Sequence, residues 1–188
     1  QEAHPLAAAR QAGQEVIQVA MVHWKMRGRP EAAEPYFEKL RRIEPAHTQM
    51  LAFFRGFCAE RGDGARLAQV LQDAARATTD GGVRASLNAE IARLAEDGAN
   101  AAKAIDQWRA LLRQDPNHKS ARDALKRLYR QSSNWTALAD VLRGELDRVP
   151  AEERDARLAL LREIAGIYRD HVKQDSTLAT VLTQITQL

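Results

Sequence analysis

Histidine is the side chain best suited to bind a metal ion or transfer a proton near neutral pH, and the chain has five: His4, His23, His47, His118 and His171. They are spread along the whole sequence, and no pair has the spacing of a zinc-binding helix such as His-Glu-x-x-His. His47 and His118 each follow a proline by two residues, so equivalent positions could supply a pair of ligands. A first-turn helix residue that recurs in a repeated sequence explains the same spacing more simply. We therefore predict no metal site.

Other residue types that support catalysis also have structural explanations here. The carboxylates of Glu152 and Glu153, and of Glu31 and Glu34, lie in expected first helical turns, where negative charge stabilises the positive end of the helix dipole. The lone cysteine, Cys58, lies in a phenylalanine-rich segment, which predicts a buried thiol without a disulfide. The sequence has no glycine-rich phosphate-binding loop. We predict that the chain is not an enzyme and has no catalytic residue and no cofactor.

The charge pattern argues against nucleic acid and membrane as partners. The formal net charge is +3 over 188 residues, and charges of both signs are interspersed, whereas a phosphate-binding face needs several Lys and Arg together. No apolar stretch approaches the length of a membrane span. The expected compartment is the cytoplasm, although the chain begins at Gln1 without Met, so an upstream signal could have been removed.

Apolar residues recur at three- and four-residue spacing between short turn signals, which is typical of amphipathic helices. In the segment 101–113, for example, Ala104, Trp108 and Leu111 share one face, and Asn134 is a plausible N-cap for a later helix. We expect ten helices joined by short connections, so that consecutive helices pack as antiparallel neighbours. The predicted fold is all-α: an α-solenoid of five hairpins that form one repeat domain over 1–188, at about 5–45, 46–80, 81–116, 117–150 and 151–188.

The sequence repeats internally. A shift of 71 residues superimposes two stretches: Ala33 falls on Ala104, Phe37 on Trp108, Leu40 on Leu111 and Pro45 on Pro116. Because 71 is about twice 35, the repeating unit is a helical hairpin of about 35 residues.

This pattern resembles the tetratricopeptide repeat family, whose second helix carries a small residue, an aromatic, an apolar residue and a proline at the spacing of Ala33, Phe37, Leu40 and Pro45. Two departures stand out: Arg55 and Lys126 occupy the position where the family has a small residue in the first helix. Pro35 also lies inside a helical pattern, so we expect it to kink or delay that helix. A helical-hairpin array of another repeat class is the alternative architecture.

The resemblance implies a right-handed superhelix whose first helices line a concave groove that holds a protein or peptide. Carried over position by position, the expected groove residues are Gln18, Val22, Phe53, Gly56, Ala89, Arg93, Asp123, Arg127, Arg162, Gly166 and Arg169. Arginine is frequent in the C-terminal half of this set, and guanidinium groups suit carboxylates, so an acidic peptide is the sharper hypothesis. The alternative is that nearby Glu90, Glu96 and Glu163 neutralise these arginines.

The predicted function is a non-catalytic protein-interaction scaffold. The final segment, 176–188, ends on an apolar residue without a polar closing turn, whereas solenoids need polar terminal caps. We therefore expect that the chain is part of a longer protein, or that its last helix associates with another subunit. A self-associating structural module is one alternative function, and an RNA- or DNA-binding helical repeat is another.

Overall fold

The structure is a computed structural model that describes residues 3–98 and 100–188, with side chains described from residue 11 onward. The described residues form ten α-helices and two π-helical segments, η1 and η2, and no strand. The prediction of an all-α chain of short-linked helices is therefore confirmed. The helices are α1 (Ala3–Met21, continued by η1, Val22–Met26), α2 (Pro30–Ile43), α3 (Thr48–Arg61), α4 (Gly64–Ala77), α5 (Gly81–Asp97), α6 (Ala101–Gln114), α7 (Lys119–Gln131), α8 (Trp135–Leu146), α9 (Arg154–Ile167, continued by η2, Tyr168–Val172) and α10 (Asp175–Thr186).

Side-chain caps fix where several helices begin. The carboxylates of Asp63 and Asp80 accept hydrogen bonds from the main-chain N–H groups of Arg66 (3.0 Å) and Val83 (2.9 Å), at the starts of α4 and α5. Asn134 accepts one from the N–H of Ala137 at 3.3 Å, so its predicted role as an N-cap is confirmed. These bonds satisfy N–H groups that have no partner inside the helix.

Of the two effects expected of Pro35, a kink or a delay of its helix, the delay does not occur. Helix α2 begins at Pro30 and runs through Pro35 to Ile43. Proline at the first helical position is preorganised for the helix, because its φ is fixed and its N–H is not needed there. The favourable start at Pro30 therefore outweighs the hydrogen bond that Pro35 cannot donate.

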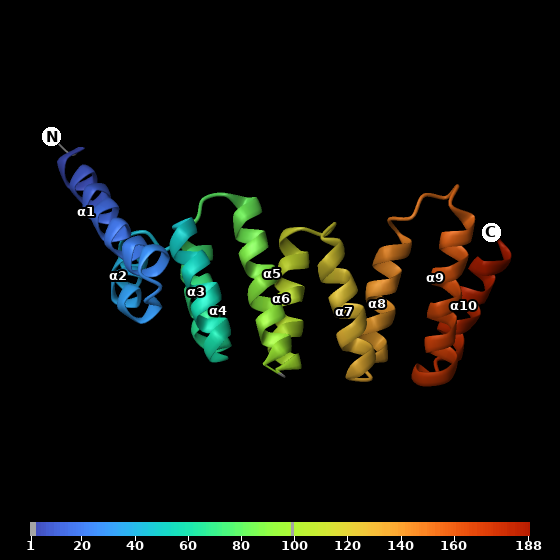
Figure 1. Cartoon of the computed structure of the whole chain (residues 1–188). Coiled ribbons are helices and arrows are strands. Elements are labelled where there is room, and N and C mark those ends of the chain that lie inside the picture. The colour runs from blue at the N-terminus through green and yellow to red at the C-terminus, as the bar shows by residue number, and fades with distance from the viewer. Residues whose placement is uncertain (1–2, 99) are drawn as a thin grey trace. The chain divides into compact units, whose positions relative to one another are not determined.

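The chain divides into two compact units, residues 1–107 and 108–188, and the boundary lies within α6. In the first unit, α1 packs on α2, α2 on α3, α3 on α4 and α4 on α5; in the second, α7 packs on α8, α8 on α9 and α9 on α10 (Figure 1). Each of these contacts joins helices that are neighbours in sequence, which is the contact pattern of a helical repeat. The single repeat domain over 1–188 stays a prediction.

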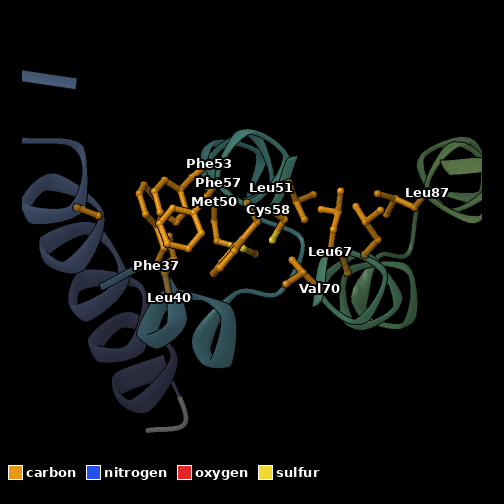
Figure 2. Close-up of a cluster of buried hydrophobic side chains, with 14 of the residues drawn as sticks. Phe37, Leu40, Met50, Leu51, Phe53, Phe57, Cys58, Leu67, Val70 and Leu87 are labelled. Carbon is orange, nitrogen blue, oxygen red and sulfur yellow. The ribbon is translucent and has the colours of Figure 1, made fainter. Parts of the chain in front are cut away.

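Five aromatic rings form the centre of the core in the first unit. Phe53 stacks on Phe37 (ring centroids 4.3 Å apart) and on Phe57 (5.0 Å). It also makes edge contacts with Phe54 at 5.2 Å and Trp24 at 5.4 Å. Figure 2 shows Phe37, Phe53 and Phe57 together at one side of this buried cluster. Because Trp24, Phe37 and Phe53 come from three different helical elements, the cluster joins the first hairpin to the second.

The core of the second unit is mainly aliphatic. Leu138 and Leu142 of α8 are each 1% exposed, and Leu161 of α9 is 2% exposed. Tyr168 of η2 is also buried, with the guanidinium of Arg143 over its ring at 5.0 Å from the centroid. Apolar residues at three- and four-residue spacing therefore point into the core here too, as the sequence predicts.

The two π-helical segments each bring a histidine against an aromatic ring. In η1, His23 stacks on Tyr36 of α2, with centroids 5.6 Å apart and ring planes 12° apart. In η2, His171 stacks on Trp135 of α8, with centroids 3.7 Å apart and planes at 9°. A π turn contains an extra residue relative to an α turn, so each segment redirects the side chains at the end of its helix.

The central position of Phe53 leads to the first prediction. We expect Phe53→Ala to lower the free energy of unfolding of the first unit by about 3–5 kcal/mol, because it removes a buried ring and leaves a cavity. Urea unfolding followed by circular dichroism measures this change. The control is Val83→Ala at a side chain that is 45% exposed, where we expect less than about 0.5 kcal/mol. Equal effects of the two substitutions would contradict the central role of Phe53.

Candidate functional site

In the first unit, the structure places the expected groove residues at different depths. Gln18 of α1, Gly56 of α3 and Arg93 of α5 are exposed, and Val22 of η1 is half-buried. Phe53 and Ala89 are buried, at 1% and 5% exposure. In this structure only the exposed and half-buried members of the set are accessible to a partner.

Phe53 has a structural role that the repeat register does not reveal. The register correctly places it on the first helix of the second hairpin, but Trp24 from η1 packs edge-on against its ring at 5.4 Å. Position in a repeat predicts the direction of a side chain and not what covers it. The ring of Phe53 therefore stabilises the contact between hairpins and does not form part of an open surface.

In the second unit, four of the expected groove residues are exposed and carry charge. Asp123 and Arg127 lie on α7, Arg162 on α9 and Arg169 on η2, and Gly166 of α9 is half-buried. The Asp123 Oδ1 atom lies 3.1 Å from the ammonium of Lys126.

The neighbouring residues Arg169 and Asp170 form a two-point ion pair. The Arg169 Nε donates to Asp170 Oδ1 at 2.8 Å, and Nη2 donates to Oδ2 at 3.0 Å. These hydrogen bonds lower the pKa of the Asp170 carboxyl and raise the pKa of Arg169. The pair is exposed at the surface, so Arg169 is already partly satisfied within the chain.

Two of the three glutamates expected to neutralise the groove arginines, Glu90 and Glu163, pair with other residues. Glu90 accepts two hydrogen bonds from Arg55, at 2.8 Å each, and these raise the pKa of the Arg55 guanidinium. Glu163 is bound by the guanidinium of Arg130, and Glu96 is not free either. Within residues 11–98 and 100–188, no carboxylate forms an ion pair with Arg93 or Arg162.

Ion pairs also explain why Arg55 and Lys126 occupy the position where tetratricopeptide repeats have a small residue in the first helix. Arg55 of α3 reaches Glu90 of α5, one repeat further along. Lys126 of α7 donates to Glu145 of α8 at 2.7 Å and is close to Asp123. A long side chain with a charged end can lie along the apolar surface while its head group pairs at the edge. The departures from the family pattern therefore form bridges between helices.

Two glycines of the expected groove have no packing reason within the chain. Gly56 lies inside α3 and Gly166 inside α9, and a Cβ built at either position would meet nothing within 4 Å. Glycine inside a helix is about 1 kcal/mol less favourable than alanine. Both positions thus expose bare helix backbone at a cost in stability.

The open space at these glycines gives a second prediction. We expect Gly56→Ala and Gly166→Ala each to raise the free energy of unfolding by about 0.5–1 kcal/mol, because alanine favours the helix and meets no clash. Thermal unfolding followed by circular dichroism measures the effect. As a control, Gly62→Ala places alanine at a left-handed backbone position, φ 65°, and is expected to destabilise. A loss of stability in Gly56→Ala or Gly166→Ala would contradict the described packing.

His47 and His118 both lie at the starts of helices, whereas the side chain of His4 lies outside the described residues. His118 accepts a hydrogen bond at Nδ1 from the N–H of Ala121 at 3.2 Å and so caps α7, and His47 occupies the same place before α3 without such a bond. In the part of the chain that the structure describes, no three His, Cys, Asp or Glu side chains form a group that could hold a metal ion. The two histidines thus mark the starts of equivalent helices, which is the simpler of the two explanations of their spacing.

The thiol of Cys58 is buried, as predicted. Cys58 is 2% exposed, and its burial raises the pKa of the thiol, which disfavours the reactive thiolate. Among the helices described, none combines the length and apolar character needed to cross a membrane.

The first unit also contains an apolar cavity of about 480 Å³, which was not predicted. Its walls include Cys58, Leu67, Ile91 and Leu94. Several alanines and glycines of α3, α4 and α5 also line it, which leaves the space open. The small residues Gly62, Gly64 and Ala65 in its wall are visible in the sequence, but their size alone does not show where neighbouring helices leave space.

Comparison with known proteins bears on the fold. No family model and no curated protein sequence matches the chain. A MamA protein of known structure superimposes with a TM-score of 0.51 at 10% identity, covering 94% of this chain and 91% of that chain. A putative kinesin light chain of Podosopora anserina with nearly identical TPR-like repeats gives 0.48 at 15% identity, covering 95% and 93%. PilF of Pseudomonas aeruginosa gives 0.47 at 15% identity, covering 96% and 93%.

The fold is a tetratricopeptide-like helical repeat. The hairpins of about 35 residues and the likeness to MamA agree on this point, and the predicted resemblance is confirmed. At 10% identity the likeness concerns the fold alone, so the function must be argued from the residues of this chain.

Proposed function

We propose that the chain is a non-catalytic protein-interaction scaffold whose first helices bind an acidic peptide segment. Tetratricopeptide-like repeats are generally scaffolds, and an array of hairpins presents a long surface without a deep active site. The likeness to known structures supports a scaffold in general terms. The binding face and the acidic ligand are inferred from the residues of this chain.

The observation that carries the proposal is the pairing of the glutamates. Glu90 and Glu163 lie next to the groove arginines on α5 and α9, yet they bind Arg55 and Arg130. In the described chain this leaves Arg93 and Arg162 exposed without a carboxylate partner. A guanidinium that is not yet neutralised favours a carboxylate from another molecule.

The glycines support the same proposal. Gly56 of α3 is exposed, and Gly166 of α9 is half-buried beside Arg162 on the same helix. Among the described residues, no atom of another helix lies within 4 Å of the place that a Cβ would take at either glycine. A bound peptide could therefore approach the helix backbone closely at these points. Close backbone approach near an unpaired arginine suits an extended peptide with acidic side chains.

We expect the double variant Arg93→Glu/Arg162→Glu to lose its partner. Hydrogen bonds to charged groups contribute about 1.5–3 kcal/mol each, so the loss should exceed roughly tenfold in affinity. The native chain and the variant are used in parallel pull-downs from a lysate of the source cells. The retained protein is then cut into peptides whose affinities are measured by fluorescence anisotropy.

The matched control is Arg109→Glu/Arg113→Glu, which makes the same charge change at two exposed positions of α6. We expect this control to bind as the native chain does. Equal loss in both variants would indicate a general charge effect, and undiminished binding by Arg93→Glu/Arg162→Glu would contradict the groove proposal. Retention of nucleic acid alone, with steep loss as salt rises, would favour the nucleic-acid alternative.

A second candidate function, self-association through α10, rests on the chemistry of its outer surface. Residues 176–188 contain no charged side chain, and Leu182 is 48% exposed. The hydroxyls of Thr180 and Thr183 donate to the carbonyls of Ser176 (3.1 Å) and Ala179 (2.9 Å) within the same helix. Because these hydroxyls are satisfied internally, the outer surface of α10 around Leu182 is uncharged and has fewer free hydrogen-bonding groups than its composition suggests.

We expect sedimentation velocity to show a mass that rises with concentration for the native chain and stays monomeric for Leu182→Glu. A charge on an apolar contact surface costs a desolvation penalty that no partner group offsets. The control Gln184→Glu adds the same charge at another exposed position of α10 and should affect association less. A native chain that stays monomeric at all concentrations would rule out this second function.

A further inference from the structure

A polar hollow of about 640 Å³ opens at the surface of the first unit, where α4, α5 and α6 supply its walls. It shares only Ile91 with the lining of the apolar cavity, and none of the expected groove residues lines it. The side chains that give it its chemistry are Gln72, Arg76, Arg84, Asn88, Ile91 and Gln107.

Two guanidinium groups supply positive charge, and no carboxylate lines the hollow. Arg84 is exposed and donates one hydrogen bond, from Nη2 to the carbonyl of Thr78 at 2.6 Å, so its other N–H groups remain available. Arg76 is exposed, and its Nη1 lies 3.9 Å from Asp73 Oδ1, beyond hydrogen-bond distance. The other oxygen of Asp73 accepts from Arg41 at 3.0 and 2.6 Å, which draws that carboxylate away from Arg76.

Three carboxamides complete the lining. Gln72, Asn88 and Gln107 are half-buried, and none of the three side chains hydrogen-bonds to another residue in the described part of the chain. Gln72 lies on α4, Asn88 on α5 and Gln107 on α6, so each of the three helices contributes one carboxamide. A carboxamide both donates and accepts, which matches the N–H and C=O of a peptide group.

We propose that this hollow binds an acidic peptide segment. Carboxylates of the segment pair with Arg76 and Arg84, and its main chain hydrogen-bonds to the carboxamides of Gln72, Asn88 and Gln107. Two cations are too few to follow a nucleic-acid backbone, which needs a longer row of phosphate contacts. Carboxamides that are half-buried and unpaired have more to gain from a peptide than from a solvated phosphate.

The hollow is distinct from the proposed groove. Arg84 and Arg93 lie on the same helix, α5, nine residues apart, which is about 180° around an α-helix. A ligand in the hollow therefore contacts the opposite side of α5 from a ligand at Arg93. The chain would then hold two acidic segments, or two parts of one partner, on the two sides of α5.

The test is an NMR titration of the full chain with N-acetylated, C-amidated hexaglutamate. The side-chain NH₂ signals of Gln72, Asn88 and Gln107 are assigned by single substitution to Leu and then followed as the peptide is added. We expect saturable shifts of these three signals. We expect Arg76→Glu/Arg84→Glu to weaken the binding they report by at least about tenfold, as for loss of paired charges at an interface.

The groove variant Arg93→Glu/Arg162→Glu is the matched control, since it makes the same charge change on the other side of α5. We expect the shifts at the three carboxamides to be unchanged in it, whether or not the groove proposal holds. The proposal is overturned if the three signals do not shift, or if they shift equally in Arg76→Glu/Arg84→Glu. Stronger, saturable shifts of the same signals with a deoxythymidine oligonucleotide would assign the hollow to nucleic acid instead. Circular dichroism confirms that each variant is folded.

Discussion

The structure depends on the burial of apolar side chains between consecutive helices, because a single hairpin exposes apolar surface on both of its sides. In the first unit, Phe53 of the second hairpin is enclosed by Trp24 and Phe37 of the first. In the second unit, the buried leucines of α8 and α9 play the equivalent part. Most other features follow from this constraint, including the short connections and the small residues where helices approach.

Electrostatics is arranged around that core and not inside it. No polar or charged residue with a described side chain is fully buried, so ion pairs such as Arg55 with Glu90 lie at the edges of helix contacts, where each contributes little to stability. The main consequence of these ion pairs is that they determine which arginines at the surface remain without a carboxylate partner. By binding Arg55 and Arg130, Glu90 and Glu163 are withdrawn from the arginines beside them, and the exposed surface gains unpaired positive groups.

The sequence predicts the helices well because apolar spacing and caps act locally, as Asn134 illustrates. It predicts depth less well, since the burial of Phe53 depends on a ring from another hairpin. Arg55 looked like a departure from the family because its partner lies 35 residues away. The carboxamides around the polar hollow were missed, because Gln72, Asn88 and Gln107 come from three different helices that only the fold brings together. What escaped sequence reasoning was which distant side chains meet.

The π-helical segments have a consequence for comparing the repeats with one another. Each holds one more residue than the α-helical turn it replaces, and the extra residue lies inside a helix instead of in a loop. An alignment that places gaps only in loops would therefore shift by one position all residues on one side of η1 or η2. A one-residue shift turns a side chain by about 100° around the helix, so inward and outward positions would be confused. The first and last hairpins need a gap within the helix to be superimposed on the three between them.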